Sequence, residues 1–227
     1  MYPLRRYLFA ILGCLVLTSC SFRAQAQSED DSTPLEQTVE QKRQTRMRKF
    51  AESHKVVVVG SNVEAKLHDT PLFSWANPQR QAIGGALYMW THQGRPIATI
   101  GLWTYADIKD SYEYQSLHDG ALNVSSELAR DWNPRTPGIS FRPIPNCVAP
   151  GRTKSVRLIQ MRQIARDRFS SVLQKDTQLR LLPQPIYRYD ELPNDVLDGA
   201  VFSFALGTDP ECLLIFEARV INENLQW

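Results

Sequence analysis

Two stretches of the chain constrain its fold more than any other feature, because each consists of two apolar runs around a turn signal. Residues 85–105 read GALYMWTHQGRPIATIGLWTY, and residues 199–218 read GAVFSFALGTDPECLLIFEA. Gln93-Gly94 suits a two-residue hairpin turn, since glycine adopts the positive φ that such turns require. Residues 207–210, Gly-Thr-Asp-Pro, favour a turn for steric and hydrogen-bonding reasons. The sequence therefore predicts two antiparallel hairpins.

The turn positions predict which side chains share a face, because directly paired residues of an antiparallel ladder lie on the same face. In the first hairpin, Trp90 pairs with Ile97. One face then holds Leu87, Met89, Ala98, Ile100 and Leu102, and the other holds Tyr88, Trp90, Ile97, Thr99 and Trp103. In the second hairpin, Phe204 pairs with Leu213. Both faces of that hairpin are apolar, as expected for strands covered on both sides.

The face that carries Tyr88, Trp90 and Trp103 is the best candidate for a ligand-binding surface. Tyr and Trp combine a large area with a polar handle, so these rings could stack on a sugar or anchor a partner protein. The competing interpretation is a second core layer beneath the proline-rich segment 133–150. Asp209 and Glu211, at the tip of the second hairpin, are interpreted as turn residues, because exposed acids without a partner have neither a perturbed pKa nor a metal to hold.

The two hairpin sequences resemble each other. GALYMWTHQGRP and GAVFSFALGTDP both begin with Gly-Ala followed by an apolar and an aromatic residue, turn near a glycine and return through a proline. An internal duplication and convergence on the same turn chemistry would both produce this pattern. The similarity covers so few positions that convergence is the simpler interpretation.

Residues 153–175 give the clearest helical pattern, and Thr153 suits its N-cap. Apolar side chains recur there at three- and four-residue spacing and form one stripe, made of Leu158, Met161, Ile164, Ala165, Phe169 and Val172. Residues 35–54 are rich in helix formers and fit either a surface helix or a charged linker. Together these elements predict an α+β fold, a mostly antiparallel sheet with two prominent hairpins packed by one long amphipathic helix.

The start of the chain has the pattern of an export signal. A basic beginning precedes an apolar run, Leu8 to Leu17, that is too short to span a bilayer. The residues that end in Cys20, Leu-Thr-Ser-Cys, resemble a lipobox, which predicts acylation of Cys20 and a lipid anchor to a membrane of the cell envelope. Cleavage near Ala26 would instead release a soluble periplasmic or secreted protein.

Composition and chain order then divide the protein into three parts. We expect an export signal at residues 1–20, a flexible tether and charged helix at 21–54, and a single globular α+β domain at 55–227. Removal of the signal leaves equal numbers of basic and acidic residues. A nucleic-acid binder normally carries a basic excess, so the chain is not expected to bind nucleic acid.

Two cysteines, Cys147 and Cys212, lie beyond the signal. They could form a disulfide, which an extracytoplasmic setting permits, or remain as two unlinked thiols. No other Cys or His lies at metal-ligand spacing from either of them. The sequence therefore predicts no metal site and no cofactor.

Several motifs are shared with a known group of proteins. They are GALYMWTHQGRP, LRLLPQPIYRYD, DGAVFSF, GTDPE and LLIFEAR, in this order, between Asn77 and Arg219. In these motifs the chain resembles a family of uncharacterised exported, lipoprotein-like proteins from planctomycete-type bacteria. The resemblance implies an exported, lipid-anchored bacterial protein, and it implies no activity and no site residues.

The candidates for catalysis are two similar dipeptides, His68-Asp69 and His118-Asp119, each preceded by leucine. A carboxylate beside an imidazole can orient it for general-base work, but adjacent residues of a strand point to opposite faces, and turn formers follow both pairs. The sequence contains no nucleophile elbow, HExxH, Walker A or GxGxxG motif. We therefore predict a non-catalytic envelope module that binds a protein or a glycan. An extracytoplasmic hydrolase using the two His/Asp pairs is the alternative.

Overall fold

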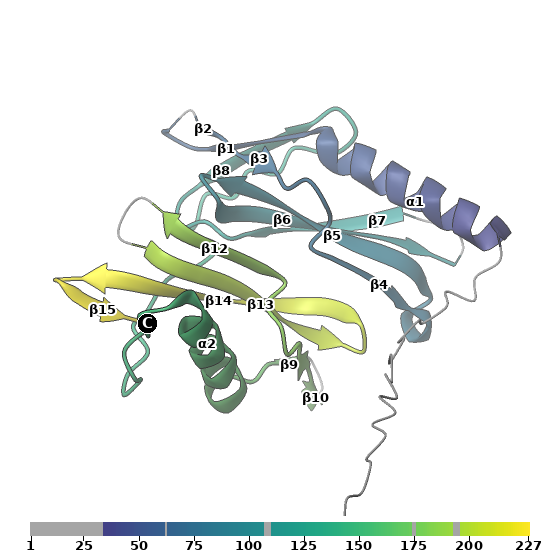
Figure 1. Ribbon diagram of the computed structural model, residues 1–227. Helices are drawn as coiled ribbons and strands as arrows, with labels where there is room; N and C mark the ends of the chain where they lie inside the picture. The colour runs from purple at the N-terminus through teal and green to yellow at the C-terminus, as the bar shows by residue number, and fades with distance from the viewer. Residues whose placement is uncertain (1–33, 62, 107–109, 174–175, 193–195) are drawn as a thin grey trace, which may run out of the picture.

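The computed structural model describes residues 34–61, 63–106, 110–173, 176–192 and 196–227, and these form two units whose sheets face each other (Figure 1). The predicted export signal, with Cys20, and the tether as far as residue 33 lie outside the described residues.

The N-terminal unit begins with a helix and continues with strands. Its elements are α1 (Pro34–Glu52), β1 (His54–Val58), β2 (Val63–Glu64), β3 (Lys66–Leu67), β4 (Phe73–Asn77), the 3₁₀ turn η1 (Pro78–Arg80), β5 (Ala82–His92), β6 (Arg95–Tyr105), β7 (Asp110–Ser116) and β8 (Leu122–Ser126). The C-terminal unit repeats this order. Its elements are α2 (Lys154–Arg168), β9 (Val172–Leu173), β10 (Thr177–Gln178), β11 (Arg180–Leu181), β12 (Tyr187–Leu192), β13 (Val196–Leu206), β14 (Asp209–Ile221) and β15 (Asn224–Gln226).

Each unit is built on one five-stranded antiparallel sheet. The N-terminal sheet has the order β3-β5-β6-β7, with β4 also paired to β5, and the C-terminal sheet has the order β11-β13-β14-β15, with β12 also paired to β13. A smaller sheet, β2-β1-β8, adjoins the first unit, and the pair β10-β9 adjoins the second.

The two helices cover the outer faces of the two large sheets, and the inner faces meet between them (Figure 1). Met47 and Ala51 of α1 pack with Trp90 and its neighbours in one core cluster. Met161 of α2 packs with Phe202 and its neighbours in a second cluster. The resulting order of layers is helix, sheet, sheet, helix.

The predicted fold class was wrong. The chain is mostly β, with 48% of residues in strands and 19% helical, and no single long amphipathic helix organises it. The predicted helix over 153–175 ends at Arg168, and Phe169 already has extended φ and ψ. Ser170 and Ser171 follow, and serine competes poorly for a helix interior. The predicted N-cap is confirmed, because the Thr153 side chain accepts a hydrogen bond from the Val156 N–H.

Most of the ambiguous segment 35–54 folds as the helix α1, which ends at Glu52, and its buried residues Met47 and Ala51 make it part of the folded core. This extends the packed region to the N-terminal side of the domain predicted at 55–227. Cys147 and Cys212 are both half-buried, free thiols.

Both hairpins form, and the first turns at Gln93-Gly94 as predicted, but both registers differ from the prediction by one residue. Trp90 pairs with Ala98 rather than Ile97, and Phe204 pairs with Cys212 rather than Leu213. Each return strand contains a bulge directly after its proline, and the extra residue shifts all later partners. The predicted faces were therefore wrong as well.

The two units are structural repeats with a constant spacing of 114 residues along the chain. Trp75 of β4 pairs with Gly85 of β5, and Tyr189 of β12 pairs with Gly199 of β13. In both places the aromatic ring lies directly over the glycine, where a Cβ atom would overlap it. The bulges after the two prolines also obey this spacing.

The helices obey the same spacing in sequence and in contacts. Arg43, Met47, Arg48 and Ala51 correspond to Arg157, Met161, Arg162 and Ala165. Arg48 donates to the Asp69 carbonyl, and Arg162 donates to the carbonyl of the corresponding residue, Pro183. Agreement over helix, strands and bulges indicates an internal duplication, so the simpler interpretation of the hairpin similarity as convergence was wrong.

Candidate functional site

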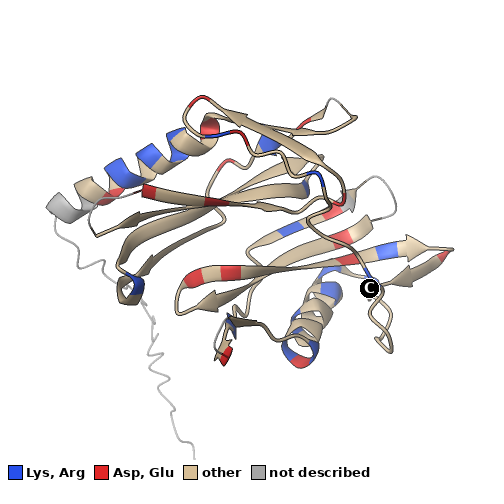
Figure 2. Ribbon diagram, turned by 180° about the vertical axis from the view of Figure 1, so that it is seen from behind, with Lys and Arg blue, Asp and Glu red and all other residues tan. Residues whose placement is uncertain are grey.

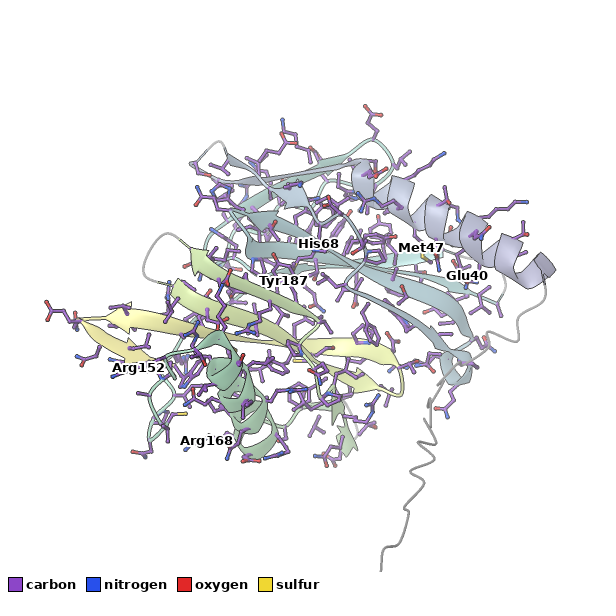
Figure 3. The ribbon with its side chains drawn as sticks, viewed as in Figure 1. Glu40, Met47, His68, Arg152, Arg168 and Tyr187 are labelled. Atoms are coloured by element: carbon purple, nitrogen blue, oxygen red, sulfur yellow. The ribbon has the colours of Figure 1, made fainter. Side chains whose placement is uncertain are left out.

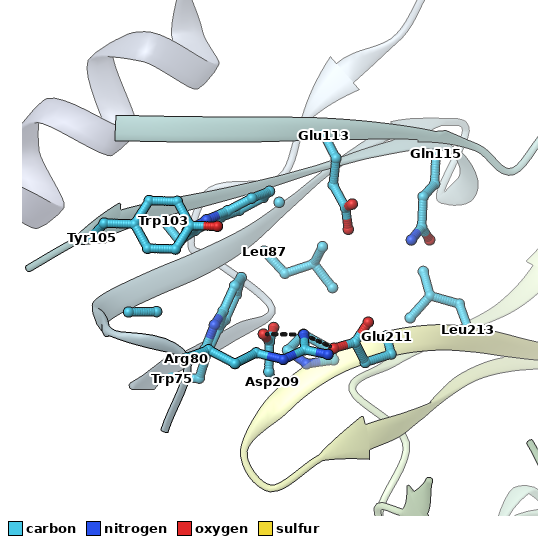
Figure 4. A pocket seen from close by; sticks show the side chains of 13 residues that line it. Trp75, Arg80, Leu87, Trp103, Tyr105, Glu113, Gln115, Asp209, Glu211 and Leu213 are labelled. Carbon is cyan, nitrogen blue, oxygen red and sulfur yellow. Dashed lines mark hydrogen bonds and ion pairs between the residues drawn. The ribbon is translucent and has the colours of Figure 1, made fainter. Parts of the chain in front are cut away.

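A cleft of about 90 Å³ opens between the inner faces of the two sheets, beside the tip of the β13–β14 hairpin (Figure 4). We call it the inter-sheet cleft. Its lining combines aromatic, acidic and apolar side chains from both units, namely Trp75, Arg80, Ala82, Leu87, Gly101, Trp103, Tyr105, Glu113, Gln115, Asp209, Pro210, Glu211 and Leu213.

The floor of the cleft is an ion-pair cluster that joins the two units. Arg80 lies 3.4 Å from Asp209 and also pairs with Glu211 (Figure 4). The short turn η1 presents Arg80, and Gln81 ends this turn in the left-handed region with φ 59°. Thr208 anchors the hairpin tip from the other side, because its hydroxyl donates to the Ala76 carbonyl. The sequence interpretation took the two acids at the tip as turn residues without a partner. In the structure, both pair with Arg80.

The cleft carries more negative than positive charge. Glu113 of β7 points into it from the opposite sheet (Figure 4), so three carboxylates share one guanidinium. Burial raises the pKa of Asp209 to about 6, and the charges of Glu211 and Glu113 add to this effect and outweigh Arg80. Burial and the charge of Glu211 also raise the pKa of Glu113. Burial is the largest cause of both raised pKa values, and the neighbouring carboxylates add to it.

Aromatic rings form the other side of the cleft. The Trp103 and Tyr105 rings meet edge to face, with centroids 6.3 Å apart. Trp75 is 8% exposed, and its indole Nε1 has no hydrogen-bond partner among the described residues. A buried N–H without an acceptor costs stability.

Replacement of Asp209 with Asn should raise the melting temperature at pH 7.5 by a few degrees. The folded-state pKa of about 6 lies above the ordinary value of 3.8, so the folded chain binds this proton more tightly than the unfolded chain. The folded state therefore loses stability as the pH rises from about 4 through 6, and the Asn side chain escapes that loss. Calorimetry of both proteins at pH 4 and pH 7.5 checks this, and an equal or lower melting temperature for D209N at pH 7.5 would contradict it.

The structure separates the three aromatic residues predicted to bind a ligand. Tyr88 and Trp90 are 2% and 1% exposed and pack in the core beneath α1, so a ligand cannot reach them. Trp103 lies on the opposite face of the sheet and lines the inter-sheet cleft. The prediction put all three on one face because it lacked the bulge that follows Pro96.

The two His/Asp pairs are parts of turns. The ring of His68 bonds the backbone of Thr70, and its Asp69 neighbour lies 3.8 Å from Lys66. His118 accepts the Gly120 N–H through Nδ1, at 2.9 Å. Asp119 lies 3.6 Å from His118 Nε2 at the surface.

In the part of the chain that the structure describes, no hydrogen bond or ion pair joins one His/Asp pair to the other. His68 instead meets Tyr187 edge to face between the two units (Figure 3). Within the described ranges, no group of three His, Cys, Asp or Glu side chains could hold a metal ion.

Comparison of the chain with protein-family models, with curated proteins and with solved structures returned no significant match. In the part of the chain that the structure covers, neither helix is long and apolar enough to cross a membrane.

Proposed function

We propose that the protein is an exported, non-catalytic envelope module, lipid-anchored through Cys20, that binds a partner protein by capturing one of its cationic side chains in the inter-sheet cleft. The sequence of residues 1–20 supports export, and its resemblance to exported planctomycete proteins agrees with this. Cleavage near Ala26, which would give a soluble protein, is the alternative to the anchor.

The observation that carries the binding proposal is the uncompensated negative charge of the cleft. A guanidinium or ammonium group would relieve the raised pKa values of Asp209 and Glu113. The rings of Trp103 and Tyr105 add aromatic surface, which attracts cations through the negative faces of the rings.

The size of the cleft favours a side-chain head group over a sugar. At about 90 Å³ it is well below the roughly 300–1,000 Å³ of typical small-molecule sites. We therefore favour a protein partner over a glycan. The hydrolase alternative is not supported by the arrangement of its residues, because both His/Asp pairs lie in turns where each histidine bonds nearby backbone.

Titration with N-acetyl-arginine amide, followed by NMR at the indole N–H of Trp75 and Trp103, tests the proposal. We expect saturable shifts with this probe and none with N-acetyl-glutamine amide, which has no charge. Glu113→Gln should weaken binding roughly tenfold, because it removes one charge-assisted contact. Binding should also weaken as the pH falls below about 6, where Asp209 becomes protonated.

Glu127→Gln is the matched control, since Glu127 is exposed on the loop after β8 and the net charge changes equally. Equal binding of the arginine and glutamine probes would reject the proposal. Shifts with an N-acetylglucosamine oligomer, without any effect of arginine, would also reject it and favour the glycan version.

A further inference from the structure

The outer edges of β6 and β14 differ, although the two strands hold equivalent positions in the two units. β7 pairs with β6 from Ala98 to Thr104. β15 follows a tight turn at Asn222-Glu223 and pairs with β14 only from Arg219 to Ile221. Within the described ranges, no strand pairs with the outer edge of β14 between Asp209 and Ala218.

The alternation of an antiparallel ladder fixes which backbone groups this edge offers. Residues Arg219 and Ile221 turn their N–H and C=O groups toward β15. Every second residue of a strand turns its backbone groups to the same side, so the N–H and C=O groups of Leu213, Ile215 and Glu217 also point to this edge. No described strand pairs with them there. Such a row of unpaired groups is a template for another strand.

A groove of about 450 Å³ lies along this edge, and we call it the edge groove. Its lining is mainly apolar and includes Phe141, Ile144, Phe169, Leu214, Phe216 and Trp227. The wall opposite β14 is fixed, because the Ile144 N–H donates to the Trp227 carbonyl at 2.9 Å, and Arg168 donates to the Pro145 carbonyl at 2.7 Å. Its volume lies within the roughly 300–1,000 Å³ range of ligand sites.

The edge groove has an excess of positive charge. Glu217 is buried there and is compensated by Arg95 at 2.9 Å and by Arg219 at 3.3 Å. Both guanidinium groups also lie over the Phe141 ring. Arg142, on the wall, is exposed and makes no ion pair within the described part of the chain. A ligand with negative charge would complement this groove.

We propose that β14 binds an extended peptide segment of a partner protein, in which apolar residues alternate with acidic ones. The segment adds to the sheet as an outer strand through the backbone groups of Leu213, Ile215 and Glu217. Its apolar side chains enter the edge groove, and its carboxylates face Arg142 and Arg219. This site shares only Leu213 with the lining of the inter-sheet cleft, and it does not depend on the proposed capture of a cation.

An eight-residue acetylated peptide of alternating valine and glutamate is the probe, followed by ¹H–¹⁵N NMR of the full chain. We expect saturable shifts and slowed hydrogen exchange at the amides of Leu213, Ile215 and Glu217. The same peptide with lysine in place of glutamate should bind roughly tenfold more weakly. A peptide N-methylated at the residues that face β14 should not bind, because it lacks the donors of the ladder.

Arg142→Glu should weaken binding of the valine-glutamate peptide and strengthen binding of the valine-lysine peptide. Arg130→Glu, at another exposed site without a described partner, should change the binding of neither peptide. Absent shifts on β14, or equal binding of the N-methylated peptide, would overturn the proposal. Shifts of the same amides that depend on protein concentration without peptide would also overturn it, because the occupant would then be a second copy of the chain.

Discussion

Asp198→Ala should destabilise the protein by about 3–5 kcal/mol, the largest effect that we expect of a single polar substitution. Asp198 is fully buried and accepts from Arg157 at 2.7 Å and from Arg188 at 2.7 and 3.1 Å. Arg157 is only 3% exposed, so the substitution leaves its charge buried without a carboxylate. Urea denaturation of both proteins measures the difference directly.

Asp167→Ala is the control for that experiment. Asp167 also pairs with an arginine at 2.8 Å, but both side chains are exposed at the end of α2. Exposed ion pairs contribute little, so the urea midpoint should stay close to that of the unmodified protein. A loss of less than about 1 kcal/mol for D198A would show that water reaches Arg157 and replaces the carboxylate.

Gly199→Ala should cost about 1–3 kcal/mol, because it overpacks a site that has no free space. A Cβ at residue 199 would lie 2.3 Å from the Tyr189 ring. That ring is 5% exposed and donates through its hydroxyl to Glu217 at 2.8 Å, so it cannot move without breaking a buried hydrogen bond. The repeat predicts a comparable loss for Gly85→Ala, where the Cβ would lie 2.4 Å from Trp75.

Gly101→Ala provides the matched control, since a Cβ there would meet its nearest neighbour, in Glu113, at an ordinary 3.5 Å. Its melting temperature should not fall. Equal melting temperatures of G199A and G101A would contradict this prediction. They would show that the Tyr189 ring can move away from residue 199 without a loss of stability.

The hairpins and the N-cap could be predicted from sequence because they depend on local chemistry. A glycine with positive φ at Gly94 and a hydroxyl at Thr153 act within a few residues of themselves. The registers could not be predicted, because each depends on one bulged residue that leaves no signal in the apolar pattern. One such residue, Ile97, places Trp103 on the opposite face of the sheet from Trp90.

The candidate site was missed for a different reason. Asp209 and Glu211 were visible as acids at a turn, but Arg80 and Glu113 come from the other unit and meet them only in the folded chain. The signal that could have found them is the repeat itself. The spacing that relates Gly85 to Gly199 also relates the two aromatic residues over them, Trp75 and Tyr189, and it implies two similar sheets.

Both helices carry basic residues (Figure 2), but the equivalent arginines Arg43 and Arg157 have different carboxylate partners, and this has a consequence for how the chain folds. A chain that contains the same packing pattern twice can dock a helix on the wrong sheet while it folds. Arg43 lies against Gly84 and pairs with Glu40 of its own helix, whereas the equivalent Arg157 depends on Asp198 across the interface. If α2 docked on the N-terminal sheet, Arg157 would meet Gly84 and remain without a carboxylate. The buried carboxylate of Asp198 therefore favours docking of α2 on the C-terminal sheet. This difference between the two repeats disfavours the exchanged arrangement of the helices.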